Sequence, residues 1–252
     1  MTRLTALSAS RAVLDALAQG APPRVLGLYT NSANLISGDE VFSLVEPSAR
    51  NLPRGILVRL LAGFAWKDAA IAPGARVEVD GPRLRLSPRV VVDLSCTTPW
   101  EPRRRLGPAP FSPEAVRRGL PGALAAMDGA GGMGALAAYF YGLAAGTEPD
   151  PPSGNLFQAR GARLISDAMA CLHAADQEGF LRASIGLVGL GIGLTPSGDD
   201  ILTGLVGSLV LLAERIPRLG WLPGTASRLA EGARGRTTDV GLTYLRCAAE
   251  GE

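Results

Sequence analysis

Residues 24–45 read RVLGLYTNSANLISGDEVFSLV, and this stretch decides the fold of the first half of the chain. Apolar side chains alternate over Arg24–Thr30 and over Ala33–Ser37, and an Asn-Ser pair lies between the two segments, as in a β-hairpin. Glu40–Val45 follows as a third predicted strand. The stretch therefore predicts a sheet built from sequential short strands.

The same pattern continues along the chain. We expect further strands at Gly55–Leu60, Ala75–Val79, Leu84–Leu86 and Arg89–Leu94. Asp80-Gly81-Pro82 is a strong turn signal between two of them. Short strands separated by turns favour an antiparallel sheet or a small barrel.

The composition changes after residue 100. Residues 100–110, WEPRRRLGPAP, predict a connector whose arginine run is a solvated linker. Ser112-Pro113-Glu114 then predicts a helix start, because Ser caps, Pro suits the first turn and Glu favours the positive dipole end. Helices are expected at Ala115–Met127, Met133–Ala145, Asn155–Gln177 and Phe180–Ser184, with a loop at Thr147–Gly154.

The fold class that follows is α+β. We expect a β-rich N-terminal domain over residues 1–110 and a helical domain over residues 111–252.

The composition of the chain excludes some classes of function. A net charge of +2 and only 5% aromatic residues argue against a nucleic-acid partner. Neither a signal peptide nor a membrane-spanning apolar run is present, which predicts a cytoplasmic protein without a membrane partner.

Cysteine and histidine usage limits the chemistry further. Cys96, Cys171 and Cys247 are far apart and are expected to be buried free thiols, not a disulfide framework or a zinc motif. The single histidine, His173, excludes an HExxH site and a histidine cage within one chain, and is expected to be a structural or solvated helix residue. Acid–base chemistry must then rely on carboxylates, on the ligand or on a partner chain.

The candidate site is Gly189–Asp200, which reads GLGIGLTPSGDD. Its glycines allow positive φ and close approach to a ligand. Thr195 is expected to cap a helix that starts at Pro196, so that free N–H groups face a small anion carrying phosphate or carboxylate. The expected anion contacts are Gly191, Gly193, Thr195, Ser197 and Gly198.

Asp199 and Asp200 are the candidate catalytic residues. They differ by about 100° around the helix, so only one needs to face the ligand. Other roles stay open: the carboxylates could complement the helix dipole, hold Mg²⁺ or an amine, or hold the glycine-rich loop through its N–H groups. The glycines could also serve helix packing. No Walker lysine follows them and their spacing does not match a dinucleotide fingerprint, so no cofactor is expected, with Mg²⁺ left open.

Two further segments are candidates for anion contacts. Residues 234–239 offer guanidinium and hydroxyl groups that could clamp phosphate or carboxylate, or they could form an ordinary solvated loop. Asn51–Gly55 is a polar turn whose arginine could reach a ligand, although turn chemistry explains it too. The residues concerned are Arg54, Arg234, Arg236, Thr237 and Thr238.

Three segments carry a family resemblance. Leu190–Gly204 resembles the glycine motif of the AllH-like family of oxamate carbamoyltransferase subunits, formerly a domain of unknown function. Asn51–Val58 and Thr237–Gly251 resemble its N-terminal strand motif and its threonine-rich helix. The family pattern continues to a further SGxD-type motif, so we expect a truncated, fragmentary or divergent member.

The resemblance implies a cytoplasmic subunit that acts with AllF-like and AllG-like partners in purine and allantoin degradation. Their reaction would interconvert oxalurate and phosphate with oxamate and carbamoyl phosphate. Asp199 or Asp200 would orient the amine or amide, and the catalytic centre could equally lie on another subunit. Two alternatives remain: a non-catalytic anion-binding scaffold or sensing subunit, and a Mg²⁺-dependent phosphotransferase.

Overall fold

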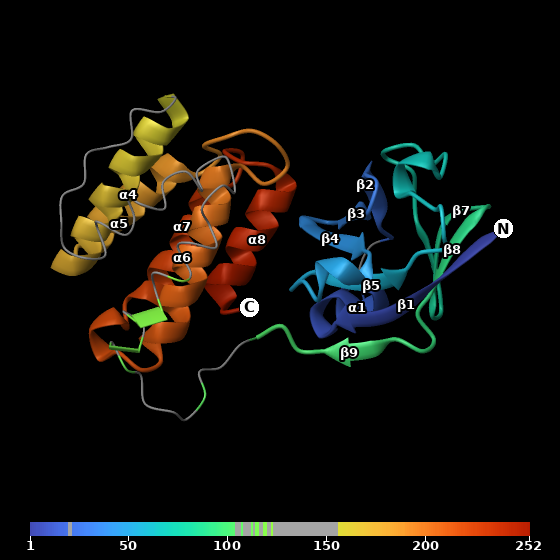
Figure 1. Ribbon diagram of the computed structural model, residues 1–252, viewed down its shortest axis with the longest axis horizontal. Coiled ribbons are helices and arrows are strands. Elements are labelled where there is room, and N and C mark those ends of the chain that lie inside the picture. The colour runs from blue at the N-terminus through green and yellow to red at the C-terminus, as the bar shows by residue number, and fades with distance from the viewer. Residues whose placement is uncertain are drawn as a thin grey trace. The chain divides into compact units, whose positions relative to one another are not determined.

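The computed structural model describes residues 1–19, 22–103 and 156–252, and residues 107, 112, 114, 115, 118, 119 and 122 between them. The chain divides into two compact units, Met1–Arg104 and Arg105–Glu252. Strands form the first unit and helices the second, as Figure 1 shows for each unit. The α+β class predicted from the sequence, with a β-rich N-terminal part, is confirmed.

The first unit is a nine-stranded mixed sheet. Its strand order is β2 (Arg24–Leu28), β3 (Ser32–Ser37), β4 (Glu40–Val45), β5 (Gly55–Arg59), β1 (Thr2–Ser10), β8 (Val90–Asp93), β7 (Arg83–Ser87) and β6 (Glu78–Asp80), and β9 (Thr98–Trp100) pairs with β1. Helix α1 (Arg11–Gln19) follows β1, and short 3-10 turns occupy Pro47–Ala49 and Trp66–Asp68.

The sheet differs from the predicted antiparallel arrangement because a strand at the N-terminus enters its middle. β1 pairs antiparallel with β5 but parallel with β8 and β9, and β4 and β5 are also parallel. A bridge between Arg24 and Arg76 connects β2 to the segment before β6. The two ends of the strand order therefore approach each other, and the sheet curls.

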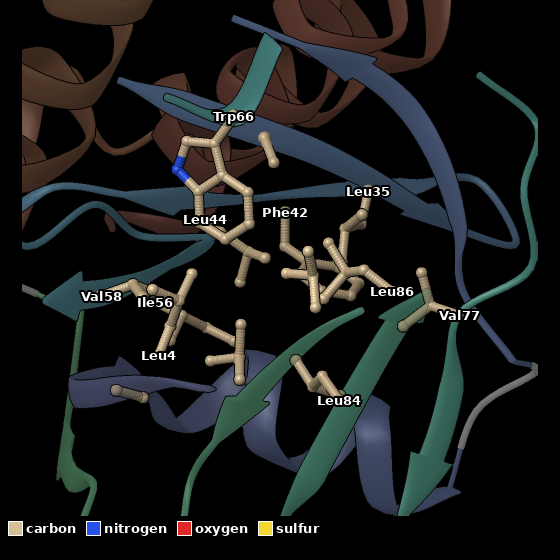
Figure 2. Packing of buried hydrophobic residues seen from close by; sticks show 14 of the residues in the cluster. Leu4, Leu35, Phe42, Leu44, Ile56, Val58, Trp66, Val77, Leu84 and Leu86 are labelled. Carbon is tan, nitrogen blue, oxygen red and sulfur yellow. The ribbon is translucent and has the colours of Figure 1, made fainter. Parts of the chain in front are cut away.

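The core of this unit lies inside the curl. Figure 2 shows Leu4, Leu44 and Trp66 among the side chains that fill the space between the strands and α1. These three residues are at most 1% exposed. The Ser10 hydroxyl accepts a hydrogen bond from the Val13 N–H at 3.3 Å, which caps the first turn of α1 above this core.

The second unit contains five described α-helices. They are α4 (Leu156–Ala174), α5 (Gln177–Leu187), α6 (Ser197–Ala213), α7 (Leu222–Gly232) and α8 (Asp239–Glu250), with a 3-10 turn at Pro217–Leu219. α6 packs along α8 through Leu202, Val206 and Leu245, and Gly207 brings the two backbones close at Ala248. This packing places the start of α6 beside the start of α8.

Most predicted elements of the described residues are confirmed. The strand Glu40–Val45 has the predicted bounds, and Asn155–Gln177 and Phe180–Ser184 correspond to α4 and to the longer α5. The predicted helices Ala115–Met127 and Met133–Ala145 and the loop Thr147–Gly154 lie largely or wholly outside the described residues. Near them, the Ser112 hydroxyl accepts a hydrogen bond from the Ala115 N–H at 3.2 Å, as a helix cap does.

The cysteines and the histidine are partly as predicted. All three cysteines are free, but only Cys247 is buried; Cys171 is half-buried and Cys96 is exposed, so the expectation of burial was wrong for Cys96. His173 lies exposed in the last turn of α4, as a solvated helix residue. No helix in the described part of the chain has the length and apolar character needed to span a bilayer.

Candidate functional site

The glycine-rich loop runs from the end of α5 at Leu187 to the start of α6 at Ser197, and we call residues 188–196 the glycine loop. Gly189, Gly191 and Gly193 have φ values of +71°, +129° and +97°. Residues that carry a Cβ rarely adopt this region of φ, so the prediction that these positions require glycine is confirmed at all three.

Close backbone contacts explain three glycines without a ligand. A Cβ on Gly189 would lie 2.2 Å from the Arg236 carbonyl oxygen, and a Cβ on Gly191 would lie 2.7 Å from the Ser197 nitrogen. A Cβ on Gly198 would lie 2.1 Å from the Leu187 carbonyl oxygen. Gly193 differs, because nothing lies within 4 Å of its Cβ position. Protein packing therefore accounts for much of the motif, and only Gly193 faces open space.

The Asp199 side chain binds the glycine loop through hydrogen bonds. Its side chain is buried at 1% exposure. One carboxylate oxygen accepts the Gly189 N–H at 2.8 Å, and the other accepts a hydrogen bond from the Thr237 hydroxyl. Both oxygens are thus engaged inside the protein, which matches the alternative that an aspartate holds the loop through a backbone N–H.

Thr238 makes a second attachment at the start of α8. Its hydroxyl donates to the Leu194 carbonyl oxygen and accepts the Gly241 N–H at 3.0 Å, so Thr238 is the N-cap of α8. Gly241 itself must be small, since a Cβ there would lie 2.6 Å from an Asp199 carboxylate oxygen. Thr238 therefore fixes the glycine loop to the start of α8 directly, and Thr237 does so through Asp199.

The start of α6 differs from the sequence prediction. Pro196, with φ −51° and ψ 141°, is the N-cap, and α6 begins at Ser197, so the prediction of Thr195 as cap was wrong. The Gly198 N–H donates to the Leu190 carbonyl oxygen at 2.8 Å and is not free for an anion. Ser197, half-buried in the first turn, is the remaining predicted donor at this helix end.

Asp200 lies on the exposed side of the same turn. The Thr195 hydroxyl hydrogen-bonds to its carboxylate. Partial desolvation raises the pKa of the Asp200 carboxyl above its ordinary value; the Thr195 hydrogen bond opposes the rise, and the adjacent Asp199 carboxylate adds to it. An exposed carboxyl of raised pKa in the first turn of a helix, beside a loop, is a candidate proton acceptor.

Of the three arginines predicted to contact an anion, two belong to the same unit as the glycine loop and one belongs to the first unit. The Arg236 backbone touches Gly189, and its side chain is exposed with no ion pair among the described residues. Arg234 is also exposed, two residues before it. Arg54 belongs to the first unit, where its guanidinium is nearly buried and lies 3.4 Å from a Glu40 carboxylate oxygen.

The structure brings together the glycine loop, both aspartates, Thr237 and Thr238. The residues named as contacts from the sequence did not include Gly241, and Leu194 was included only as part of the segment Gly189–Asp200. Gly241 had no local signal in the sequence, because the Thr238 cap uses a backbone N–H that other residues also supply, and the need for glycine comes from the contact with Asp199. Among the described residues, no three carboxylate, imidazole or thiol groups gather in a way that could hold a metal ion.

Comparison with known proteins gives one finding for this part of the chain. Searches of curated proteins and of solved structures find no match. The family model of the oxamate carbamoyltransferase subunit AllH matches residues 187–252, which contain the glycine loop, α6 and α8. Over these residues the chain is similar to the AllH family, and this match supports the resemblance of Leu190–Gly204 and Thr237–Gly251.

Proposed function

We propose that the chain is a cytoplasmic subunit of an oxamate-type carbamoyltransferase and that the glycine loop carries its anion site. One observation carries the proposal. Asp199 and the two threonines just before α8 fix the loop, while Ser197, Asp200 and Arg236 keep their side chains at least partly exposed around it. All of these residues lie within the part of the chain that the family model matches.

The chemistry fits such a site. In the direction of oxalurate synthesis, the oxamate nitrogen attacks the carbamoyl carbon of carbamoyl phosphate. A C–N bond forms, the C–O bond to phosphate breaks, phosphate leaves and the nitrogen gives up a proton. This reaction needs two anions held side by side and a proton acceptor, but no protein nucleophile.

Each exposed group has a role in this proposal. Arg236 binds phosphate or carboxylate through its planar guanidinium, and the N-terminal end of α6 at Ser197 adds the positive end of the helix dipole. Asp200, whose carboxyl pKa is raised, accepts a hydrogen bond and then the proton from the oxamate nitrogen. Asp199 has both oxygens engaged, so it positions the loop and does not touch substrate.

The site also needs a cover, because carbamoyl transfer must exclude water from the reacting carbon. Gly193 faces open space, and Ile192 beside it is 85% exposed. We propose that AllF-like and AllG-like subunits supply this cover and that the complex serves purine and allantoin degradation. Ser197, Asp200 and Arg236 would then line one wall of a shared site.

Reconstitution tests the proposal. Phosphate release from carbamoyl phosphate and oxamate is measured with the chain alone, with the two partner subunits alone, and with all three together. We expect activity only in the complete mixture. In that mixture, Asp200→Asn should lower kcat by about 100-fold, as loss of a general base does, whereas Asp167→Asn on the exposed face of α4 should leave kcat unchanged.

A second pair of variants tests anion binding. Arg236→Gln should raise the KM for carbamoyl phosphate or for oxamate by about tenfold, the effect of one lost charge-assisted contact, and Arg163→Gln on α4 is the control. Full activity of both Asp200→Asn and Arg236→Gln in the assembled complex would overturn the site. It would favour the non-catalytic scaffold role instead.

A further inference from the structure

Three pockets of the first unit meet at one side chain, Arg76. The largest, of about 1000 Å³, lies beside α1, and the others measure about 310 Å³ and about 290 Å³. Arg76 lines all three, and Arg24 lines the smallest of them with Ile36 and Gly38. Two arginines thus border one small pocket in a region that the glycine loop does not include.

The backbone brings these arginines together. Arg24 and Arg76 are directly opposite in an antiparallel bridge. The flanking hydrogen bonds run from the Val25 N–H to the Ala75 oxygen at 2.9 Å and from the Val77 N–H to the Pro23 oxygen at 2.7 Å. This pattern makes Arg24 and Arg76 a non-hydrogen-bonded pair, the closer of the two antiparallel arrangements, with both side chains on one face.

That face points away from the core. Val25 and Val77, the next residue of each segment, are 1% and 0% exposed and point inward, so the alternation of side chains directs both arginines outward. Ile36 is the partner of Arg24 on β3, and it supplies an apolar wall of the pocket. The two guanidinium groups therefore reach the same small pocket from adjacent strands.

No carboxylate among the described residues forms an ion pair with either arginine. Glu78, two residues beyond Arg76, is paired instead with Arg85 at 3.3 Å. Like charges that are directly opposite in a sheet destabilise it. The smallest pocket thus has two close positive charges and no carboxylate among its described lining residues, although Glu78 lines the two other pockets, and a bound anion would reduce the repulsion.

We propose that Arg24 and Arg76 bind a small phosphate- or carboxylate-bearing anion in this pocket. Two guanidinium groups offer paired N–H donors that match the oxygens of either group. The pocket volume of about 290 Å³ suits a small ligand. This site lies in the first unit and does not depend on the function proposed for the glycine loop.

The test is a titration of the full-length ¹⁵N-labelled chain with inorganic phosphate, followed by NMR. Saturable shifts are expected at the backbone amides of Ile36, Gly38 and Val77, with a Kd of about 1 mM for a small anion. Arg24→Gln and Arg76→Gln should each weaken binding by about tenfold. Arg59→Gln, an exposed arginine on β5 of the same sheet, is the matched control and should leave the Kd unchanged.

The outcomes separate cleanly. A lack of saturable shifts at these amides, or an equal loss of affinity in Arg59→Gln, would overturn the proposal. A parallel titration with phenyl phosphate identifies the ligand type, since Arg76 also lines the larger pocket with Leu14 and Leu17. Tighter binding of phenyl phosphate would indicate an organic phosphate, and equal binding would indicate the free ion. Shifts confined to residues 188–200 would place the anion at the glycine loop and would also overturn this site.

Discussion

Asp199→Ala should destabilise the helical unit through the loss of two buried hydrogen bonds. The substitution leaves the Gly189 N–H and the Thr237 hydroxyl without their acceptor. An orphaned buried donor costs about 1–3 kcal/mol, and both donor residues are half-buried, so water reaches them in part. We therefore expect the free energy of unfolding to fall by about 3 kcal/mol, a large part of the stability of a typical domain.

Asp200→Ala is a matched control for this effect. Both aspartates lie in the first turn of α6 and complement its dipole, a contribution of about 0.5 kcal/mol that both variants lose. Only Asp199 makes the buried bonds. Asp200→Ala loses the hydrogen bond from Thr195 instead, so the difference between the two variants measures how much more the two Asp199 bonds contribute than that one.

Urea unfolding followed by circular dichroism at the helix band measures both variants. A double-mutant cycle with Thr237→Val should give a coupling energy of about 1–2 kcal/mol between Asp199 and Thr237. The reasoning fails if Asp199→Ala lies within about 1 kcal/mol of Asp200→Ala. It fails equally if the cycle shows no coupling, because the bond between the two side chains would then contribute nothing.

Three further predictions concern single positions. Gly189→Ala places a Cβ 2.2 Å from a carbonyl oxygen and should lower the free energy of unfolding by more than about 2 kcal/mol. Gly193→Ala, where the space is open, should lower it by only about 1 kcal/mol. Equal shifts of the melting temperature in the two variants would contradict this. A hydrogen bond from the Ser95 N–H and, next in importance, one from the Arg3 side chain lower the pKa of the Asp93 carboxyl. Its stabilising contribution is complete above the ordinary aspartate pKa of about 4 and is lost as the pH falls below it. Melting curves from about pH 6 to about pH 2 should therefore depend less on pH in Asp93→Asn. Arg228→Ala breaks an exposed ion pair and should change the free energy of unfolding by less than about 1 kcal/mol; a larger loss would indicate a role beyond that pair.

Short apolar runs bounded by turn residues were predictable as strands, and β1 shows why another strand was not. Glu40–Val45 has the predicted bounds although its residues do not alternate, since all five after Glu40 are buried. In β1, Leu4 and Ala6 are buried, but the register shifts between Ala6 and Ser8, so that the buried side chains resume at Ala9. The shift interrupts the two-residue period on which a strand prediction depends. The parallel pairings of β1 with β8 and β9 followed from that missed central strand, whereas the parallel pairing of β4 with β5 joins two strands that were predicted.

The site shows a similar limit. The run of glycines, threonine and aspartates identified the loop. The sequence could not show which of its backbone N–H groups form hydrogen bonds within the protein and are therefore not available to a ligand. Leu190 lies eight positions before Gly198, and only the folded loop places its carbonyl against that N–H. Likewise, the contact between Asp199 and Thr237 joins segments that are far apart in sequence. Local motif chemistry therefore predicts which residues form the loop, but not which groups they contact.

The two aspartates differ in their surroundings, so that one stabilises the loop and the other is available for the proposed chemistry. Consecutive helical positions point about 100° apart, so Asp199 faces the segment before α8 while Asp200 faces the surface. The buried carboxylate fixes the loop and, as a nearby negative charge, also raises the pKa of the Asp200 carboxyl. Replacing Asp199 by Asn would keep one acceptor but remove that charge. The pKa of Asp200 should then fall toward its ordinary value in Asp199→Asn, and NMR titration of its side-chain carboxyl would detect the change. An unchanged pKa would show that desolvation alone raises it.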